Sequence, residues 1–565
     1  MAEIEVRPVP ESVTRLQQQG ISPLLARIFA ARGVQDGAEL ETRLNRLVPS
    51  QQLRNIEAMA RRLADAIAAQ QTLTVIADYD ADGATACACA VRGLRAMGAQ
   101  VNYLVPNRFE YGYGLTPEIV DLAHQLQPDV LITVDNGIAS LEGVERAQAL
   151  GLEVLITDHH LPGERLPRAL IVNPNQPDCP FPSKHLAGVG VMFYVLMALR
   201  AEGRRRGWFQ SRPEPNLADL LDLVALGTVA DVVKLDRNNR LLVHHGLARM
   251  RAGRLSPGLM ALFQVAKRDW RSATSHDLGF SLGPRLNAAG RLDDMSLGIR
   301  CLMTTSSDEA MQLAQELDTL NRERREIETG MQEEALASLP ARIDPQRYTL
   351  ALFDENWHQG VIGIVASRLK ERFHRPVITF APGDAGWLKG SGRSIPGLHL
   401  KDALEAVQRQ HPGLIHRFGG HAMAAGLTLA REAFATFCEA FEHTARTLMS
   451  ADMLTRRWET DGELAPEDLM LDNARWIETQ VWGQGFPPPC FHGQFRVVEQ
   501  KTVGNKHRRL TLQYANRQVE AMLFFHEDPL PDFIDAIYQL SVNRFMGQVR
   551  LQLILQKWEA SHRDD

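Results

Sequence analysis

The sequence has few cysteines and no long apolar run, and both absences narrow the class of protein. Its 565 residues include six cysteines, none of which forms a C-x-x-C pair. A zinc ribbon is therefore not expected, and scattered cysteines suit a reducing compartment such as the cytoplasm. No run of about 18 apolar residues occurs, so we expect no membrane span. The N-terminal residues carry acids and prolines and do not resemble a signal peptide.

A surplus of basic residues is also missing, because the formal net charge is −6. Its absence does not exclude nucleic acid as a partner, since a metal site is itself acidic and a local basic groove can coexist with a negative total. The composition, 45% hydrophobic and 23% charged, is typical of a globular protein. At roughly 100–200 residues per domain, the length predicts about three or four domains.

The first part of the chain predicts an α/β domain. Residues 1–50 are expected to form a helical arm. Between residues 51 and 305, short strands rich in β-branched residues alternate with helical patterns, which predicts a doubly wound parallel sheet. The strands are expected at 73–77, 101–105, 130–134 and 154–157. A long helix is expected over 306–340, either as a charged, solvated helix or as the connector between two domains.

The second part predicts a smaller α/β domain followed by a barrel. Residues 341–450 contain strand patterns at 348–353 and 377–380, and then a glycine-rich region. Between 455 and 560 few helices are expected, and five short strands are predicted at 495–499, 509–514, 519–525, 536–542 and 549–555. Five short strands of this kind indicate a small β-barrel, of the OB type.

Three acidic residues follow the first predicted strand. Asp78, Asp80 and Asp82 alternate with other residues, so their carboxylates would lie on one face of an extended chain. Carboxylates so close repel one another, and a divalent cation relieves the repulsion. An acidic turn that caps the next helix is the alternative interpretation. Gly83 is expected to let the backbone turn sharply toward that helix.

Three more motifs carry acids or histidines. Asp135 follows the strand at 130–134, and Asp158-His159-His160 follows the strand at 154–157. Asp231 interrupts an apolar stretch, where a lone carboxylate is costly unless it is paired or binds a cation. A turn or a helix cap is the alternative for Asp135 and Asp231.

Together these motifs predict a metal centre. Ligands of an open parallel sheet bind at the carboxyl ends of its strands, near the point where the strand order reverses. Carboxylates and imidazole suit Mn²⁺, Mg²⁺ or Zn²⁺, and the absence of a thiolate and the predominance of oxygen donors favour Mn²⁺ or Mg²⁺. Two such ions about 3.5–4 Å apart generate a hydroxide and neutralise a phosphoryl transition state. The pattern therefore predicts a two-metal phosphoesterase.

The motifs, in this order, resemble those of the DHH phosphoesterase superfamily, and most closely its single-strand-specific 5′→3′ DNA exonucleases. The matching segments are ADYDADG (77–83), TVDNG (133–137), ITDHH (156–160), GTVADVV (227–233), GPRLNAAGR (283–291), HQGVIGIVASRL (358–369), SGRS (391–394) and FGGHAMAAG (418–426). The resemblance spans about residues 50–430, and the C-terminal strands match the family's OB-like domain more loosely. It implies a DHH domain, a DHH-associated domain and a connecting helix.

The resemblance also implies roles for the acids and histidines. The metals would be held by Asp80, Asp82, Asp135, His159 and Asp231. His160 would face the scissile phosphate, and Asp158 would orient the cluster. The superfamily often has a histidine just before the first acids, where this chain has Ile76 and Ala77. Asp78 is the candidate substitute, either as a metal ligand or beside the ligands.

Further residues are assigned to the substrate by the resemblance. Ser391 and Arg393, which lie between glycines, would bind a 5′-terminal phosphate together with Arg108, since arginine binds phosphate through two N–H groups. Arg285 and Asn287 would hold the neighbouring backbone. At Gly420 and His421, glycine permits a phosphate to approach the backbone closely. A tight turn is the alternative for these last two, and a surface ion pair for each arginine.

The implied function is a metal-dependent exonuclease that degrades single-stranded DNA 5′→3′ to mononucleotides in DNA recombination and repair, including mismatch repair. Basic and aromatic residues of the predicted barrel suit strand binding by charge and stacking, namely Lys501, Lys506, His507, Arg508, Arg509, Tyr514, Phe524, Phe525, Arg544 and Phe545. The resemblance further implies a monomer whose partners are a single-strand-binding protein and a RecQ-type helicase. The alternatives are a phosphodiesterase for short oligonucleotides or cyclic dinucleotides, and a non-catalytic replication scaffold.

Overall fold

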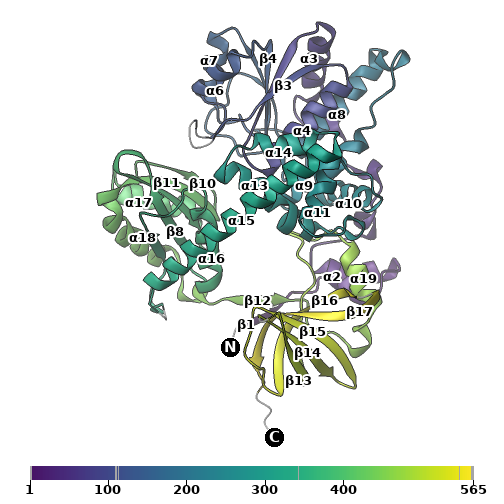
Figure 1. The fold of residues 1–565 in the computed structure, drawn as a ribbon, viewed down its shortest axis with the longest axis vertical. Helices are drawn as coiled ribbons and strands as arrows, with labels where there is room; N and C mark the ends of the chain where they lie inside the picture. The colour runs from purple at the N-terminus through teal and green to yellow at the C-terminus, as the bar shows by residue number, and fades with distance from the viewer. Residues whose placement is uncertain are drawn as a thin grey trace. The chain divides into compact units, whose positions relative to one another are not determined.

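The chain folds as two compact units. The computed structural model describes residues 3–107, 111, 113–340, 343–504, 506–545 and 547–561. The larger unit comprises residues 6–318 and 459–565, and the smaller unit comprises residues 1–5 and 319–458. Figure 1 shows the elements of both units, and each unit is described separately below.

A five-stranded parallel sheet lies in the larger unit, as predicted. Its strand order is β3-β2-β4-β5-β6. The bounds are β2 Thr72–Ala77, β3 Gln100–Leu104, β4 Val130–Val134, β5 Glu153–Thr157 and β6 Leu170–Val172. The first four confirm the predicted strands, whereas β6 lies outside the prediction because three residues are too few to show a pattern. The strand order reverses between β2 and β4, so side chains that leave these two ends gather at one place.

Helices cover both faces of this sheet (Figure 1). On one face α6 and α7 bury Ile119 and Val144 against Leu131 and Ile156. On the other face lie α3, α4 and α8. The bounds of these five helices are α3 Ile56–Ala68, α4 Ala81–Ala96, α6 Pro117–His124, α7 Leu141–Ala149 and α8 Gly188–Arg205. The doubly wound arrangement predicted from the alternating pattern is therefore confirmed.

Helices alone follow β6 in the described part of residues 173–305, where the alternating pattern was expected to continue. After α8 come the α-helices α9 Leu221–Ala230, α10 Arg237–Arg251, α11 Pro257–Val265, α12 Ser275–Asp277, α13 Gly283–Leu292 and α14 Ser296–Met303. Residues 278–282 form a π-helix that joins α12 to α13 without a break. The predicted long helix is confirmed as α15 (Ser307–Ser338), and the division between the two units falls within it.

The smaller unit contains a mixed sheet of order β10-β11-β9-β8-β7. β7 and β8 are parallel, and the remaining neighbours are antiparallel. The bounds are β7 Leu350–Phe353, β8 Val377–Pro382, β9 Trp387–Arg393, β10 Arg417–Gly420 and β11 Ala424–Ala430, with helices α16 Ile362–Phe373, α17 Leu400–Gln410 and α18 Phe434–Leu448. The region predicted only to be glycine-rich thus supplies three further strands.

A closed five-stranded barrel forms the C-terminal part of the larger unit and confirms the predicted barrel. Its order is β13-β14-β15-β17-β16, in which β15 and β17 are parallel and the other pairs antiparallel. The bounds are β13 Phe491–Val503, β14 His507–Tyr514, β15 Arg517–Phe524, β16 Phe533–Phe545 and β17 Gln548–Ala560. Closure leaves no edge strand open, which is the usual solution for so small a sheet.

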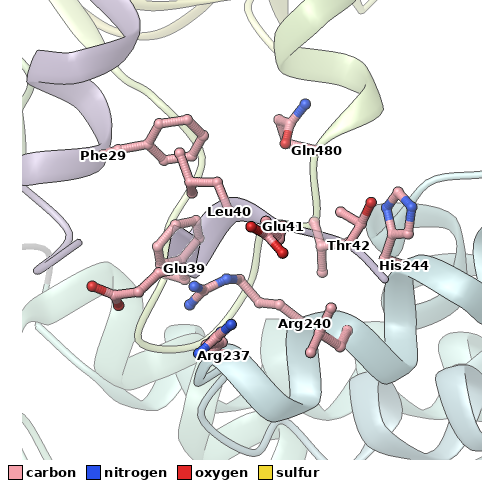
Figure 2. Close-up of a pocket in the computed structure, with 12 residues that line it drawn as sticks. Phe29, Glu39, Leu40, Glu41, Thr42, Arg237, Arg240, His244 and Gln480 are labelled. Carbon is pink, nitrogen blue, oxygen red and sulfur yellow. The ribbon is translucent and has the colours of Figure 1, made fainter. Parts of the chain in front are cut away.

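The N-terminal arm packs against the segment that precedes the barrel. The arm and this segment contain β1 Glu3–Val6, α1 Ser12–Gln18, α2 Pro23–Ala30, β12 Arg457–Thr460 and α19 Leu471–Thr479. Arg32 donates to both carboxylate oxygens of the buried Asp461, at 2.7 and 2.9 Å. Figure 2 shows a pocket at this junction, lined by Phe29, Arg240, His244 and Gln480 among others. The pocket is separate from the acidic motifs, because none of their residues lines it.

No described helix has an apolar stretch that could span a bilayer.

Candidate metal centre

The first acidic motif lies where β2 passes into α4. Asp80 caps α4 by accepting a hydrogen bond from the Gly83 N–H at 2.9 Å, and Asp82 lies in the first helical turn. The capping interpretation therefore holds for Asp80, while the motif still gathers three carboxylates. Gly83 does not form the sharp turn that we expected, because it lies inside α4. A Cβ there would lie 2.5 Å from the Asp78 carbonyl oxygen, so close packing explains this glycine.

Asp135 and the Asp158-His159-His160 segment follow β4 and β5, as the sequence predicts. Asp135 adopts a left-handed conformation with φ of 64°, and a Cβ on Gly188 would lie 2.5 Å from its Cβ. Asp231 comes from another direction, since it ends α9 as its C-terminal cap. The fold thus brings residues of two strand ends, one strand–helix junction and one helix end together.

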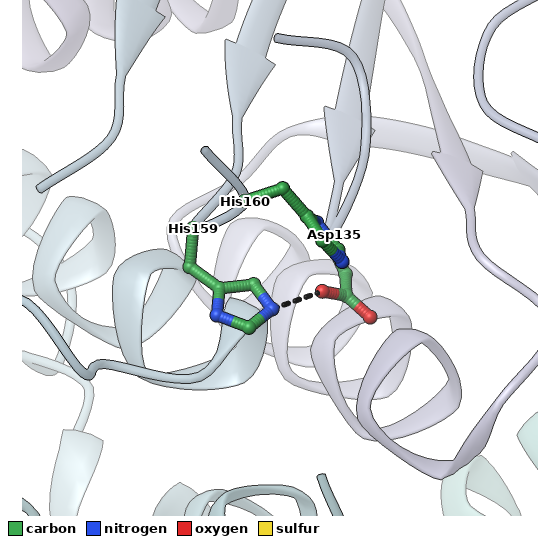
Figure 3. Close-up of side chains that lie close together, drawn as sticks. All are labelled: Asp135, His159 and His160. Atoms are coloured by element: carbon green, nitrogen blue, oxygen red, sulfur yellow. Dashed lines mark ion pairs between the residues drawn. The ribbon is translucent and has the colours of Figure 1, made fainter. Parts of the chain in front are cut away.

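His159 lies at the centre of this cluster. Its Nε2 is 3.1 Å from Asp135 Oδ1, 3.5 Å from Asp231 Oδ2 and 3.9 Å from Asp82 Oδ2. Figure 3 shows the first of these contacts, with the ring of His160 beside Asp135. Three overlapping groups have ligand atoms within 4.8 Å of one another: Asp135, His159 and His160; Asp82, His159 and Asp231; and Asp78, Asp80 and Asp135.

The electrostatics of the cluster favour a cation. Burial, followed by repulsion between the carboxylates, raises the pKa of Asp78, Asp135 and Asp231 well above the usual range, and that of Asp82 to about 7. Among the described residues no lysine or arginine lies within 4 Å of these four carboxylates. Buried charges of one sign need a counter-ion. The donor set of carboxylates and imidazole therefore fits a pair of Mn²⁺ or Mg²⁺ ions.

Asp158 contacts the two histidines rather than the centre of the cluster. Its Oδ1 accepts hydrogen bonds from the backbone N–H groups of His159 and His160 and also lies 2.8 Å from the ring atom Nδ1 of His160. Burial alone would lower the pKa of His160, but the hydrogen bond to Asp158 and the negative charges of Asp158, Asp78 and Asp80 together raise this pKa to about 9. Burial raises the pKa of Asp158, but the same hydrogen bond, the charges of the two histidines and the hydrogen bond from the Ile138 N–H together lower it. These contacts suit the orienting role predicted for Asp158.

Tyr113 was missed by the sequence reasoning. Its Oη lies 3.1 Å from His160 Nε2, and its ring packs edge-on against Tyr79, with 6.1 Å between centroids. Nothing in the pattern of the segment between β3 and α6 singles out this tyrosine. Only its place among glycines, in YGYG, is a signal that could have drawn attention to it.

Arg285 and Asn287 lie on α13, which packs against the first motif. Arg285 is paired with Asp318 at 2.8 Å and donates to the Ser281 carbonyl oxygen at 2.6 Å. The Asn287 side-chain oxygen accepts a hydrogen bond from the Ala81 N–H at 2.7 Å. Both side chains thus hold protein elements in place, and their contact with substrate stays a prediction.

Ser391 and Arg393 lie together on β9 in the smaller unit. Arg393 Nη1 donates to Ser391 Oγ at 3.2 Å and to the Gly392 carbonyl oxygen at 2.8 Å. Burial lowers the pKa of Arg393, and no described carboxylate lies within 4 Å of it. A Cβ on Gly363, in the first turn of α16, would lie 2.8 Å from Ser391 Oγ. This half-buried cation beside a helix N-terminus is a fitting environment for a phosphate.

Gly420 and His421 form the tight connection between β10 and β11. The His421 N–H donates to the Ala424 carbonyl oxygen at 2.8 Å, and a Cβ on Gly420 would lie 2.5 Å from the Cα of Ala425. The turn interpretation therefore accounts for this glycine, and a contact with phosphate stays a prediction. Arg108 lies outside the described residues.

The predicted nucleic-acid residues of the barrel differ in exposure. Phe525 and Phe545 are 84% and 65% exposed, and Phe524 is 46% exposed. Arg544 is paired with Glu478 at 2.5 Å. Three aromatic rings are thus available to a partner, whereas Phe491, Phe495 and Tyr538 fill the barrel core.

Comparison with known families agrees with this organisation. Residues 72–228 match the DHH family N-terminal domain, residues 346–447 match the DHHA1 domain, and residues 460–557 match the RecJ OB domain. The three matches cover the parallel sheet, the mixed sheet and the barrel in turn.

Similar proteins extend over nearly the whole chain. The single-stranded-DNA-specific exonuclease RecJ of Escherichia coli (strain K12) is 48% identical over 551 residues, 95% of each chain. The protein of the same name from Dickeya dadantii is 49% identical over 98% of each chain. The crystal structure of RecJ in complex with Mn²⁺ from Thermus thermophilus matches with a TM-score of 0.82 at 30% identity, over 99% of this chain and 79% of that one. A second structure of that protein contains Mg²⁺ and matches with a TM-score of 0.76 at 28% identity, over 99% and 78% of the two chains. On these similarities, the chain belongs to the RecJ family.

Proposed function

We propose that this chain is a metal-dependent exonuclease that degrades single-stranded DNA 5′→3′ to mononucleotides. The observation that carries the proposal is the cluster of buried carboxylates around His159 at the carboxyl end of a parallel sheet. Membership of a family whose relatives are named single-stranded-DNA-specific exonucleases supplies the substrate class. The closed barrel, with its exposed phenylalanines, is further support for a polymeric single strand.

The residues that would hold two divalent ions are Asp78, Asp80, Asp82, Asp135, His159 and Asp231. Mn²⁺ and Mg²⁺, the ions named for the Thermus structures, both suit this donor set. When bound, such ions supply a hydroxide nucleophile and neutralise charge on the transferring phosphoryl group. The chain's own contribution is to fix these side chains on strand and helix ends, so that little reorganisation accompanies the reaction.

His160 is the proposed phosphate contact beside the metal ligands. With a pKa raised to about 9 it is protonated at neutral pH, so it can donate a hydrogen bond to a phosphate oxygen. Asp158 holds the ring by its Nδ1, which leaves Nε2 for Tyr113 and the substrate. Asp158 and Tyr113 are therefore positioning residues.

Recognition of the 5′ end is proposed for Arg393 and Ser391, together with Arg108. A half-buried guanidinium with no carboxylate partner among the described residues gains most from a doubly charged anion, and a terminal phosphate monoester is such a group. Arg285, Asn287, Gly420 and His421 are proposed to hold the neighbouring strand. An exonuclease that needs a terminal phosphate would start at one end, which is the basis of the proposed polarity.

The cellular setting follows from the family and the cysteines. We propose a role in DNA recombination and repair, in the cytoplasm, where the six free cysteines stay reduced. A single-strand-binding protein and a RecQ-type helicase are the proposed partners, and a monomer is the proposed state. The domain division of the sequence analysis, with boundaries near residues 50, 305, 340 and 455, is proposed for the functional modules.

The test is a product analysis on strands labelled at the 5′ or the 3′ end, single or double, with Mn²⁺ or Mg²⁺ and with chelator. Mononucleotides released from the 5′ end of single strands only are expected. The double variant Asp80→Ala with Asp82→Ala is the inactive control. Intact single strands would refute the proposal, and faster turnover of a dinucleotide than of a long strand would favour a phosphodiesterase for short oligonucleotides.

A further inference from the structure

A large aromatic side chain is exposed on the π-helix that packs against the end of α9, the helix that carries Asp231. Phe280 is 69% exposed, on the π-helix of residues 278–282. Single exposed apolar residues are ordinary on protein surfaces, so exposure alone does not indicate a function. The position of Phe280 relative to Asp231, and the way the fold supports it, are what distinguish it.

The π-helix packs on the end of α9 that carries Asp231. A Cβ on Gly279, which precedes Phe280, would lie 3.3 Å from Val229 Cγ1, and a Cβ on Gly283 would lie 3.1 Å from Ala230 Cβ. Val229 and Ala230 directly precede Asp231, whose carboxylate is 3.5 Å from His159 Nε2. Phe280 is thus next to a residue that touches the helix end from which Asp231 enters the metal centre.

The same helix end exposes a second apolar side chain. Val232, the residue after Asp231, is 63% exposed and has a φ of 59°, a left-handed conformation that is strained for a β-branched residue. Strain of this kind persists only where the surrounding structure imposes it, and it gathers at functional sites. Here the imposed turn aims an apolar side chain at solvent beside a metal ligand.

Local sequence explains why the helix is widened at Phe280. Pro284 has no N–H and cannot donate to the Phe280 carbonyl as an α-helix requires, and its ring would clash with that carbonyl. A π-turn relieves the clash, and such turns recur at functional sites. The ring of His276 supports that of Phe280 edge-on, with 4.6 Å between centroids. The helix then continues as α13 to the first motif, where Gly290 is in tight contact with the Tyr79 carbonyl oxygen.

We propose that Phe280 is a base-stacking residue that positions the substrate strand at the metal centre, with Val232 extending the apolar surface. This inference rests on the proposed function and deepens it. Every base has a π-face, so a stacking residue holds a strand without reading its sequence. A rigid platform next to the metal ligands would also fix where the scissile phosphate lies.

The test compares Phe280→Ala, Phe280→Leu and Phe280→Trp in the full chain with Mn²⁺, on a short 5′-phosphorylated single strand. Loss of one stacked base raises KM about ten-fold in Phe280→Ala. Phe280→Leu recovers part of the loss, and Phe280→Trp recovers it fully. Met260→Ala on α11, which removes another exposed apolar side chain of the same unit, leaves KM unchanged. Because Phe280 is largely exposed, all four variants are expected to fold.

Strands with one abasic position, placed in turn along the first nucleotides, separate stacking from a general loss of apolar surface. At one position the missing base raises KM for the wild type but has little effect on Phe280→Ala, because the lost partner is the same. A Phe280→Ala enzyme with wild-type KM, or equal penalties at every abasic position in both proteins, overturns the inference. If the wild type itself leaves single strands intact, the proposed function fails instead.

Discussion

The two α/β sheets of this chain gather side chains of opposite charge. The parallel sheet of the larger unit ends in carboxylates whose pKa values are raised by burial and mutual repulsion, such as those of Asp82 and Asp135. The mixed sheet of the smaller unit instead holds the half-buried Arg393, whose pKa is lowered by burial and which forms no ion pair with a described carboxylate. An acidic cluster needs cations and a half-buried guanidinium needs an anion. Similar architectures would thus provide, in one chain, the proposed places for metal and for phosphate.

The largest effect on activity is expected for the acidic residues at the end of the parallel sheet. Asp135→Ala removes the carboxylate closest to His159 Nε2, 3.1 Å away, and should lower the hydrolysis rate by roughly 10³-fold or more, because the proposed two-ion site would lose a residue that belongs to two of its three ligand groups. Calorimetric titration with Mn²⁺ should show weaker binding in parallel. The matched control is Asp121→Ala on α6, which breaks only the exposed pair with Arg146. If Asp135→Ala hydrolyses single strands at the wild-type rate, Asp135 is not part of the metal centre.

The second expected effect is a pH-dependent stability that arises from the carboxylates at the end of the parallel sheet. The pKa of Asp82 is about 7 in the folded chain against 3.8 as the ordinary value, so between about pH 4 and 7 the folded state binds more protons than the unfolded state. Stability of the metal-free chain should therefore fall as pH rises through this window, by on the order of 2–4 kcal/mol for this group.

Denaturant unfolding of the metal-free wild type and of Asp82→Asn, at pH 5 and pH 8, measures this dependence. The variant should lose less stability than the wild type between the two values, whatever the constant cost of disturbing the hydrogen bonds from Gly188 and Val189. Mn²⁺ should restore the wild type at pH 8. Identical slopes in both proteins would contradict the raised pKa.

The difference between the two sheets also explains which strands could be predicted from the sequence and which could not. β2, β4 and β5 are apolar and β-branched, and buried parallel strands show this pattern clearly. β9 and β11 pair antiparallel through a glycine-rich stretch that resembles a loop in sequence. A Cβ on Gly390 would lie 2.5 Å from Phe380 Cε1, so this glycine makes room for a core ring. Such a requirement comes from packing across the sheet and leaves no local signal.

For the site, sequence reasoning was strongest where position in a strand fixes position in space. Asp135 and His159 follow parallel neighbours, so the sheet itself brings them together. Tyr113 contacts His160 from a position outside the helices and strands, where no periodicity encodes the contact. Arg285 of α13 pairs with Asp318 of α15, 33 residues later. Partners that depend on how helices pack could not be predicted from spacing.

An intermediate effect on substrate binding is expected for Arg393 in the mixed sheet. Arg393→Ala should raise KM for a 5′-phosphorylated strand by about 10–100-fold, because charge-assisted hydrogen bonds to phosphate are lost. KM for the same strand with a 5′-hydroxyl should change little, so the preference for the phosphate disappears. Arg409→Ala, on the exposed last turn of α17, is the matched control for loss of a positive charge in the same unit. An unchanged preference in Arg393→Ala would place 5′-end recognition elsewhere.

The smallest effect is expected from a variant that tests whether the site of Ser391 and Arg393 depends on close packing as well as on charge. Gly363→Ala keeps every charged group but adds a Cβ 2.8 Å from Ser391 Oγ and 3.0 Å from Arg393 Nη2. Both side chains must then shift by several tenths of an ångström, and the preference for a 5′-phosphate should fall by roughly three- to ten-fold. The matched control is Gly330→Ala in α15, where no atom lies within 4 Å of the added Cβ. It should leave the preference unchanged and stabilise the helix by about 0.5–1 kcal/mol. If Gly363→Ala also leaves the preference for a 5′-phosphate unchanged, Arg393 acts by long-range charge alone. The site around Arg393 would then not depend on the close placement of its side chains, unlike the proposed metal centre.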